Sequence, residues 1–141
     1  AGAVAEYEKR AGRYWKFEVI EVASGAPTND PSPDAVRKAE GERILSRIPP
    51  TIEVIAMTRD GKGMDSRELS KYLEERGIRA SAGVAFVIGG AFGLGAEVLE
   101  RSDRRLSLST MTLTHEMARL FLTEQVYRAG TILRGEPYHK G

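Results

Sequence analysis

Four glycines follow an apolar stretch at residues 87–95, where the sequence reads VIGGAFGLG. Because glycine has no side chain, the main-chain groups of such a run can lie directly against a ligand. A second segment with small polar residues, LSLSTMTLTHE at residues 106–116, follows after a short polar stretch. Two loops of this kind at the ends of neighbouring strands suit a nucleotide-like cofactor, and the residues between them determine which cofactor it is.

The common phosphate-binding motifs fit the glycine run poorly. A P-loop needs Gly-Lys-Ser/Thr, yet no lysine lies between Lys71 and Lys140. The dinucleotide fingerprint needs a third glycine, which is missing after Gly93 and Gly95. An NAD-dependent oxidoreductase is therefore disfavoured. Taken alone, the loop also fits a tight strand-to-helix turn that holds no ligand.

Short apolar runs that predict strands alternate with amphipathic segments that predict helices. The expected strands are residues 16–22, 52–57, 84–88 and 106–108, and the expected helices are residues 34–48, 65–77, 96–101 and 115–133. Asp65 lies three residues before Glu68, which is the capping-box spacing at a helix start. Residues 25–33 are rich in Pro, Asn, Asp and Ser and predict an exposed loop. Continuous apolar strands alternating with helices predict an α/β fold with a mainly parallel sheet covered on both faces.

The composition indicates one ordinary globular domain. The chain has 141 residues, which suits a single core, and no apolar run approaches the ~20 residues needed to span a bilayer. It has no cysteine and only two histidines, so we expect neither disulfides nor a metal site. The first residues do not form a basic segment followed by an apolar one, so the cytoplasm is the expected location.

Charge is distributed unevenly along the chain, although the net charge is only +1. From residue 101 onward there are seven basic residues and four acidic ones. A basic C-terminal third could contact phosphate groups, but solvated charge on helix faces explains the same count equally well.

Four motifs in this sequence closely resemble the RlmH family. They are IGGAFGL at residues 88–94, SLSTMTLTH at 107–115, EQVYRA at 124–129 and GEPYH at 135–139. The resemblance extends over nearly the whole chain and includes residues 6–10, 41–45 and a turn at 60–62. It implies a SPOUT-class methyltransferase that uses S-adenosyl-L-methionine to methylate N3 of a pseudouridine in 23S rRNA. It also implies one domain over residues 1–141, a SPOUT α/β-knot with a C-terminal trefoil knot, and a first strand that this chain lacks.

The resemblance assigns the cofactor contacts to three places in the chain. These residues are Met57, Gly90, Ser109, Thr110, Met111, Thr112, Leu113 and Thr114. Their types agree with this assignment, since an adenine ring needs an apolar slot with main-chain donors and acceptors at its edge. Plain core packing is the alternative for Met57 and Leu113.

The resemblance also suggests the residues that act on the substrate. We expect His115 to shape the substrate edge of the site, and Tyr138 or His139 to touch the base or to relay its proton. Arg128, together with Arg134, would hold a phosphate or a carbonyl group. Because a histidine in a tail is usually just solvated, the role of His139 depends mainly on its motif.

Members of the family are homodimers that act on assembled ribosomes, so we expect a second copy and 23S rRNA within the ribosome as partners. The last predicted helix has more apolar residues than a cofactor pocket needs, and part of that face should pair with its twin. The apolar residues of this helix are Met117, Leu120, Phe121 and Val126. A non-catalytic RNA-binding module with the same knot is the alternative function, and a cofactor titration would separate the two.

Overall fold

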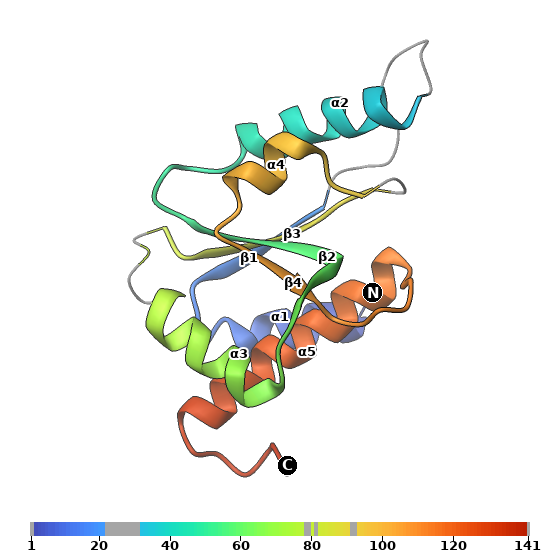
Figure 1. The fold of residues 1–141 in the computed structure, drawn as a ribbon. Helices are drawn as coiled ribbons and strands as arrows, with labels where there is room; N and C mark the ends of the chain where they lie inside the picture. Colours follow the sequence, from blue (N-terminus) through green and yellow to red (C-terminus); the bar gives the residue numbers. More distant parts are fainter. Residues whose placement is uncertain (1, 22–31, 78–79, 81, 91–92, 141) are drawn as a thin grey trace.

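A parallel four-stranded sheet forms the centre of the molecule (Figure 1). The structure is a computed structural model that describes residues 2–21, 32–77, 80, 82–90 and 93–140. The strands are β1 (Phe17–Glu21), β2 (Glu53–Gly63), β3 (Val84–Ile88) and β4 (Arg104–Ser107). They lie in the order β1-β3-β2-β4, and each pair of neighbours is parallel. The predicted α/β fold with a mainly parallel sheet is confirmed. The trefoil knot stays a prediction.

Helices cover both faces of this sheet (Figure 1). One face carries α2 (Pro33–Ser46) and α4 (Ala96–Arg101), which contact each other. The opposite face carries α1 (Gly2–Ala11), α3 (Ser66–Tyr72) and α5 (His115–Leu133), with α1 and α3 both packed against α5. A short π-helical segment, η1 (Leu73–Gly77), continues α3. Most of the predicted loop at 25–33 lies outside the described residues.

Strand β3 separates the two cores, because its side chains alternate between the faces of the sheet. Val84, Phe86 and Ile88 belong to the core beneath α1, α3 and α5, whereas Ala85 and Val87 belong to the core beneath α2 and α4. All five residues are buried. The continuous apolar run therefore has the burial expected of a central strand in a parallel sheet.

Local capping signals define where two of the helices begin. The predicted capping box is present at α3, where the Asp65 side chain accepts from the Glu68 amide and the Glu68 side chain accepts from the Asp65 amide. Thr114 caps α5, since its Oγ1 accepts from the amide of Met117 at 3.2 Å. Helix α5 therefore begins at His115, as the sequence predicts, and this fixes where that histidine lies.

Strands β2 and β4 are longer than the sequence predicts. β2 continues to Gly63, and its pairing with β4 shifts between Met57 and Lys62, so the expected turn at 60–62 is an irregularity within the strand. β4 begins at Arg104, where Ile55 of β2 is its partner. The polar residues and glycines in these extensions give no local signal for a strand. They are part of strands because β2 and β4 pair with each other, and this long-range pairing overrides local propensity.

Helix α5 is fixed against the N-terminal segment near its middle. The Trp15 indole Nε1 donates to the carbonyl of Val126 at 3.0 Å. A Cβ placed on Gly130 would lie 2.3 Å from the ring of Tyr14, so only glycine permits this close packing. The part of α5 from Val126 to Gly130 is therefore held closely against residues 14 and 15.

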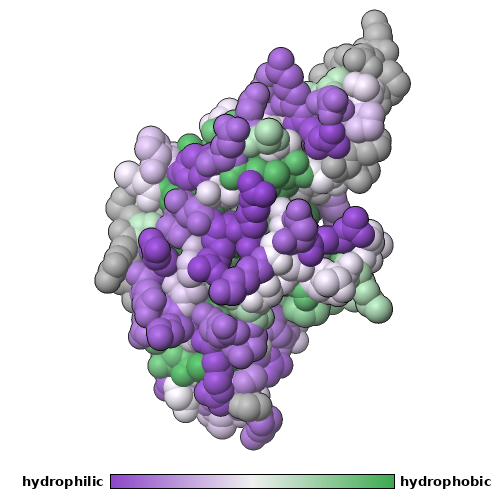
Figure 2. Space-filling model, viewed as in Figure 1, coloured by the Kyte–Doolittle hydropathy of each residue, from purple (hydrophilic) through white to green (hydrophobic). Residues whose placement is uncertain are grey.

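The face of the molecule shown in Figure 2 is mostly hydrophilic, and hydrophobic groups gather on it beside α2 and α4. None of the helices described combines the length and the apolar character that a bilayer span requires.

Candidate functional site

A cavity of about 750 Å³ opens at the carboxyl ends of β3 and β4, beside the irregular part of β2. Met57 of β2, Ile88 of β3 and Leu106 of β4 line it from the sheet. The carboxyl ends of parallel strands are the usual place for ligands in open α/β sheets. The volume lies within the range of about 300–1,000 Å³ that small-molecule and cofactor sites occupy.

The glycine loop forms one wall of this cavity. Gly90 and Gly93 pair in an isolated antiparallel bridge, in which the Gly93 amide donates to the Gly90 carbonyl at 3.1 Å. Gly93 has φ +80°, a conformation that favours glycine. A Cβ on Gly89 would lie 2.8 Å from the main chain of Gly93. The loop therefore needs glycine for its own closure, and its main chain is bare toward the cavity.

The segment 108–114 forms the wall next to the start of α5. The Ser109 hydroxyl accepts from the amide of Met111 at 3.0 Å, which shapes the turn. Arg59, in the irregular part of β2, donates from Nη1 to Thr112 Oγ1 at 2.8 Å. A side chain from β2 thus connects to this segment at the edge of the cavity.

The structure brings nearly all of the predicted cofactor residues together. The cavity is lined by Met57, Gly90, Ser109, Met111, Thr112, Leu113 and Thr114. Thr110 does not line it. Met57 also packs against the core beneath α5, as the alternative of core packing requires, and its contact with the cofactor stays a prediction. The hydroxyl of Thr114 already serves as the helix cap.

Sequence reasoning missed several lining residues, which come from other parts of the fold. They are Arg37, Thr58, Arg59, Asp60, Leu94, Leu99, Leu106, Leu108 and Ala118. Arg37 lies on α2 and could not be found from local pattern, because the contact between α2 and the glycine loop is long-range. The residues after Met57 could have been found from their position at the end of a buried strand.

His115 is the one predicted substrate residue that lines the cavity. Its Nδ1 lies 3.9 Å from the Glu21 carboxylate at the end of β1. Glu21 also pairs with Arg119 at 3.0 Å, and Arg119 in turn pairs with Glu8 at 3.2 Å. The imidazole is therefore held at the rim by a carboxylate that is itself fixed by an arginine one helical turn further along α5.

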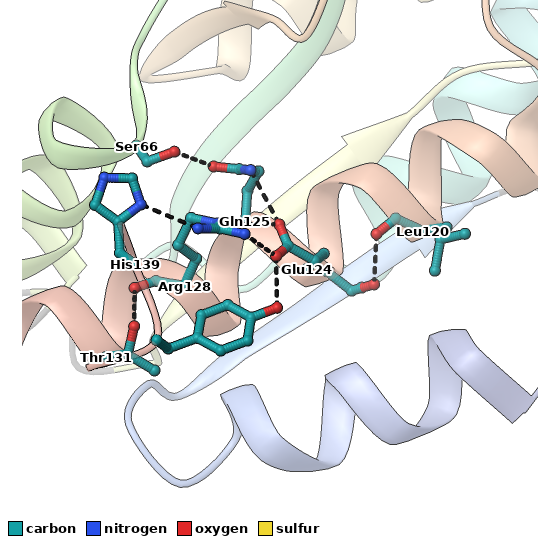
Figure 3. Close-up of polar contacts among 9 residues, drawn as sticks. Ser66, Leu120, Glu124, Gln125, Arg128, Thr131 and His139 are labelled. Carbon is teal, nitrogen blue, oxygen red and sulfur yellow. Dashed lines mark hydrogen bonds and ion pairs between the residues drawn. The ribbon is translucent and has the colours of Figure 1, made fainter. Parts of the chain in front are cut away.

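Arg128, Tyr138 and His139 form a separate group at the other end of α5, which we term the tail cluster together with Glu124 (Figure 3). Glu124 is its centre, because its Oε2 accepts from Arg128 Nη2 and from the Tyr138 hydroxyl, both at 2.7 Å. The Arg128 guanidinium lies 4.8 Å from the centre of the Tyr138 ring. Gln125 also donates to Glu124, at 3.0 Å.

The contacts of the tail cluster show which of its groups donate and which accept hydrogen bonds. Arg128 Nη1 lies 3.0 Å from His139 Nδ1, and a guanidinium has only donors, so Nδ1 must accept. The hydrogen of the imidazole ring is then on Nε2. Burial, followed by the bond to Glu124, raises the pKa of Tyr138 above its usual value. The bond to Glu124 likewise raises the pKa of Arg128. Near neutral pH the cluster therefore offers N–H and O–H donors and a cation.

The predicted substrate residues are thus not brought together within one chain. His115 and Arg128 are thirteen positions apart on one helix, which places them about 20 Å apart along its axis. Arg134 belongs to neither group, since it lies over the Tyr14 ring at 4.9 Å. Among the described residues, no group of three or more His, Cys, Asp or Glu side chains could hold a metal ion.

The apolar residues expected on one face of α5 differ in how deeply they are buried. Met117 and Phe121, one turn apart, are 53% and 43% exposed. Leu120 is partly buried, whereas Val126 lies fully in the core. Val126 therefore belongs to the part of this face that packs inside the molecule, where α1 and Trp15 cover the helix. The pairing of the exposed part with a second copy stays a prediction.

Comparison with known proteins gives consistent matches. Residues 1–139 match the family model described as "Predicted SPOUT methyltransferase". A protein of Gemmatimonas aurantiaca named ribosomal RNA large subunit methyltransferase H is 52% identical over 141 residues, covering 99% of this chain and 90% of that protein. Proteins of the same name from Carboxydothermus hydrogenoformans and Clostridioides difficile are 46% and 44% identical, each over 97% of this chain and 88% of the relative.

Proposed function

Because this chain belongs to the SPOUT methyltransferase family and, within it, to the ribosomal RNA large subunit methyltransferase H group, we propose that it methylates N3 of a pseudouridine in 23S rRNA. The methyl donor is S-adenosyl-L-methionine. The supporting observation is the cavity at the carboxyl ends of β3 and β4, beside the irregular part of β2, where seven of the eight expected cofactor residues meet. The proposal includes a single domain over residues 1–141 and a C-terminal trefoil knot.

The cavity fits this cofactor in volume and in the chemistry of its walls. When bound, S-adenosyl-L-methionine supplies a methyl group already activated on a sulfonium centre. Met57, Ile88 and Leu106 provide an apolar floor, and the bare main chain around Gly90 provides donors and acceptors. Since the methyl group needs no further activation, the task of these residues is to fix its position and to exclude water.

His115 and the tail cluster handle the base. His115 stands at the rim of the cavity and orients the ring that receives the methyl group. His139 Nε2–H donates to a carbonyl of the base, and Arg128 provides a fixed positive charge beside it. Both stabilise the negative charge that forms on the base when the N3 proton passes to solvent water and the N3 lone pair takes the methyl group. Tyr138, held as a donor by Glu124, keeps Arg128 and the tail in this arrangement.

The two groups act on one base when they come from two copies of the chain. A separation of about 20 Å along α5 exceeds the width of a single base, so one chain cannot place both on the same atom. Met117 and Phe121 expose apolar surface at the cavity end of α5, where a second copy would bury it. A homodimer in which the tail cluster of one copy reaches the cavity of the other would form the complete site.

The RNA partner is 23S rRNA, and its target base lies within an assembled ribosome. The net charge of +1 gives little general attraction for naked RNA, so recognition depends on shape and on a few phosphate contacts. The target base must be exposed in a loop or flipped to reach the bottom of the cavity.

The deciding experiment is mass spectrometry of large-subunit rRNA from cells that lack this gene. One methylated pseudouridine should disappear, and the purified protein with labelled S-adenosyl-L-methionine should restore it on ribosomes from those cells. Unchanged rRNA would overturn the proposal. RNA binding without cofactor binding or methyl transfer would support the alternative, a non-catalytic RNA-binding module.

A further inference from the structure

Glu40 on α2 is a buried acidic residue that has no partner among the described residues. Its residue surface is 2% exposed, and both carboxylate oxygens lie out of contact with solvent. Neither oxygen has a hydrogen-bond partner, and no ion pair among the described residues includes Glu40. Burying such a group costs several kcal/mol, so an unpaired one in a folded protein requires an explanation.

The carboxylate of Glu40 lies against Gly90 of the glycine loop. A Cβ placed on Gly90 would be 2.4 Å from Oε2 and 2.6 Å from Oε1, so the carboxylate fills the space that any other residue would need. Gly90 also lines the cavity, whereas Glu40 itself does not. The main chain of one glycine therefore contacts both the buried carboxylate and the site proposed for the cofactor.

Arg37 lies on the same helix, one turn before Glu40. It lines the cavity and pairs with Asp34. Gly41, the next residue of α2, packs against the apolar side chain of Val98. The carboxylate of Glu40 faces the cavity across the main chain of Gly90, and Arg37 is a charged neighbour on the cavity side.

This arrangement distinguishes the two forms of the proposed cofactor. S-adenosyl-L-methionine has one positive charge more than S-adenosyl-L-homocysteine, since methyl transfer converts a sulfonium into a neutral thioether. The two molecules are otherwise almost the same size, so shape alone separates them poorly. A negative charge beside the cavity distinguishes them, because it attracts the positively charged sulfonium and not the neutral thioether.

We propose that Glu40 is the specificity-determining residue that favours the sulfonium cofactor over the thioether product, acting by its charge across Gly90. The inference rests on the proposed function, because it needs the cofactor in this cavity. Glu40 touches neither ligand. After methyl transfer the attraction is lost, and the product is released more readily than the donor.

The test measures dissociation constants by isothermal titration calorimetry for S-adenosyl-L-methionine, its stable cationic analogue sinefungin, and S-adenosyl-L-homocysteine. In Glu40→Gln, affinity for the two cationic ligands should fall about tenfold, while that for the thioether changes less than twofold. Glu40→Asp keeps the charge and should keep most of the preference. Glu42→Gln, an exposed position on the same helix, is the matched control and should behave as the wild type.

Thermal unfolding of the unliganded proteins separates this role from simple packing. Removing an unpaired buried carboxylate should leave the Tm of Glu40→Gln unchanged or raise it. Equal weakening of all three ligands, or an unchanged preference in Glu40→Gln, would overturn the inference while leaving the proposed function intact. Failure of the wild type to bind any of the three ligands would instead overturn the proposed function itself.

Discussion

The cavity and the tail cluster lie at opposite ends of α5 and differ in how their polar groups are satisfied. In the cavity, the glycine loop leaves main chain bare and Glu40 unpaired beside it. In the tail cluster, Glu124 binds Arg128 and Tyr138, and Arg128 binds His139. The first region is incomplete without a ligand, whereas the second is already internally paired.

This difference indicates a division of work between binding and orientation. Unsatisfied groups gain most from a ligand, so the cavity is suited to holding a cofactor. A paired network loses little entropy when it meets a substrate, so the tail cluster is suited to presenting rigid donors. Substitutions in one region should therefore leave the function of the other unchanged.

The largest effect is expected in the tail cluster. His139→Ala removes the donor that faces the base, and the rate of methyl transfer to ribosomes should fall about a thousandfold. The dissociation constant for S-adenosyl-L-methionine should stay within twofold of the wild type. His139→Gln retains an N–H donor and should recover part of the rate. Unchanged turnover in His139→Ala would remove this residue from the mechanism.

In the cavity, by contrast, a substitution should act on cofactor affinity. Gly89→Ala places a Cβ 2.8 Å from the main chain of Gly93, which cannot move without opening the loop. Affinity for both the cofactor and its product should fall about thirtyfold, corresponding to about 2 kcal/mol. Gly63→Ala adds the same methyl group where nothing lies within 4 Å, and is the control. Normal cofactor binding by Gly89→Ala would show that the loop does not hold the cofactor.

Much of the fold could be predicted because its signals are local. The apolar run of β3, the capping box at Asp65 and Glu68, and the start of α5 at His115 each depend on a few neighbouring residues. The extension of β2 could not be predicted, because only pairing with β4 makes a strand of residues that include Asp60 and Gly61.

The candidate site was predictable where one motif forms one wall. The motifs at residues 88–94 and 107–115 meet in the cavity, but the approach of Glu40 to Gly90 joins positions fifty residues apart and leaves no local pattern. The separation of His115 from Arg128 was present in the sequence. Thirteen residues of continuous helix set it at about 20 Å, so counting along the predicted helix would have divided the substrate residues into two groups.

Mixing two impaired variants tests whether the two regions work across a dimer. Gly89→Ala weakens cofactor binding and His139→Ala removes the donor from the tail cluster, so at a cofactor concentration well below the Kd of Gly89→Ala neither protein alone should methylate ribosomes at an appreciable rate. After unfolding and refolding together, heterodimers contain one site with both regions intact, and about a quarter of wild-type activity should return. Each protein refolded alone is the control. No recovery in a mixture shown to contain heterodimers would place both regions of the site in a single chain.

The smallest effect is expected at Thr114, which both lines the cavity and caps α5. This residue lines the cavity, yet its hydroxyl accepts from the Met117 amide at 3.2 Å and caps α5. Thr114→Ala should therefore lower the free energy of unfolding by about 1 kcal/mol, measured by chemical denaturation. Cofactor affinity should change less than threefold, because the hydroxyl is already engaged by the helix. Thr114→Ser keeps the cap and should restore stability. A large loss of affinity with normal stability would instead assign the hydroxyl to the cofactor, and the cap would then be secondary to binding.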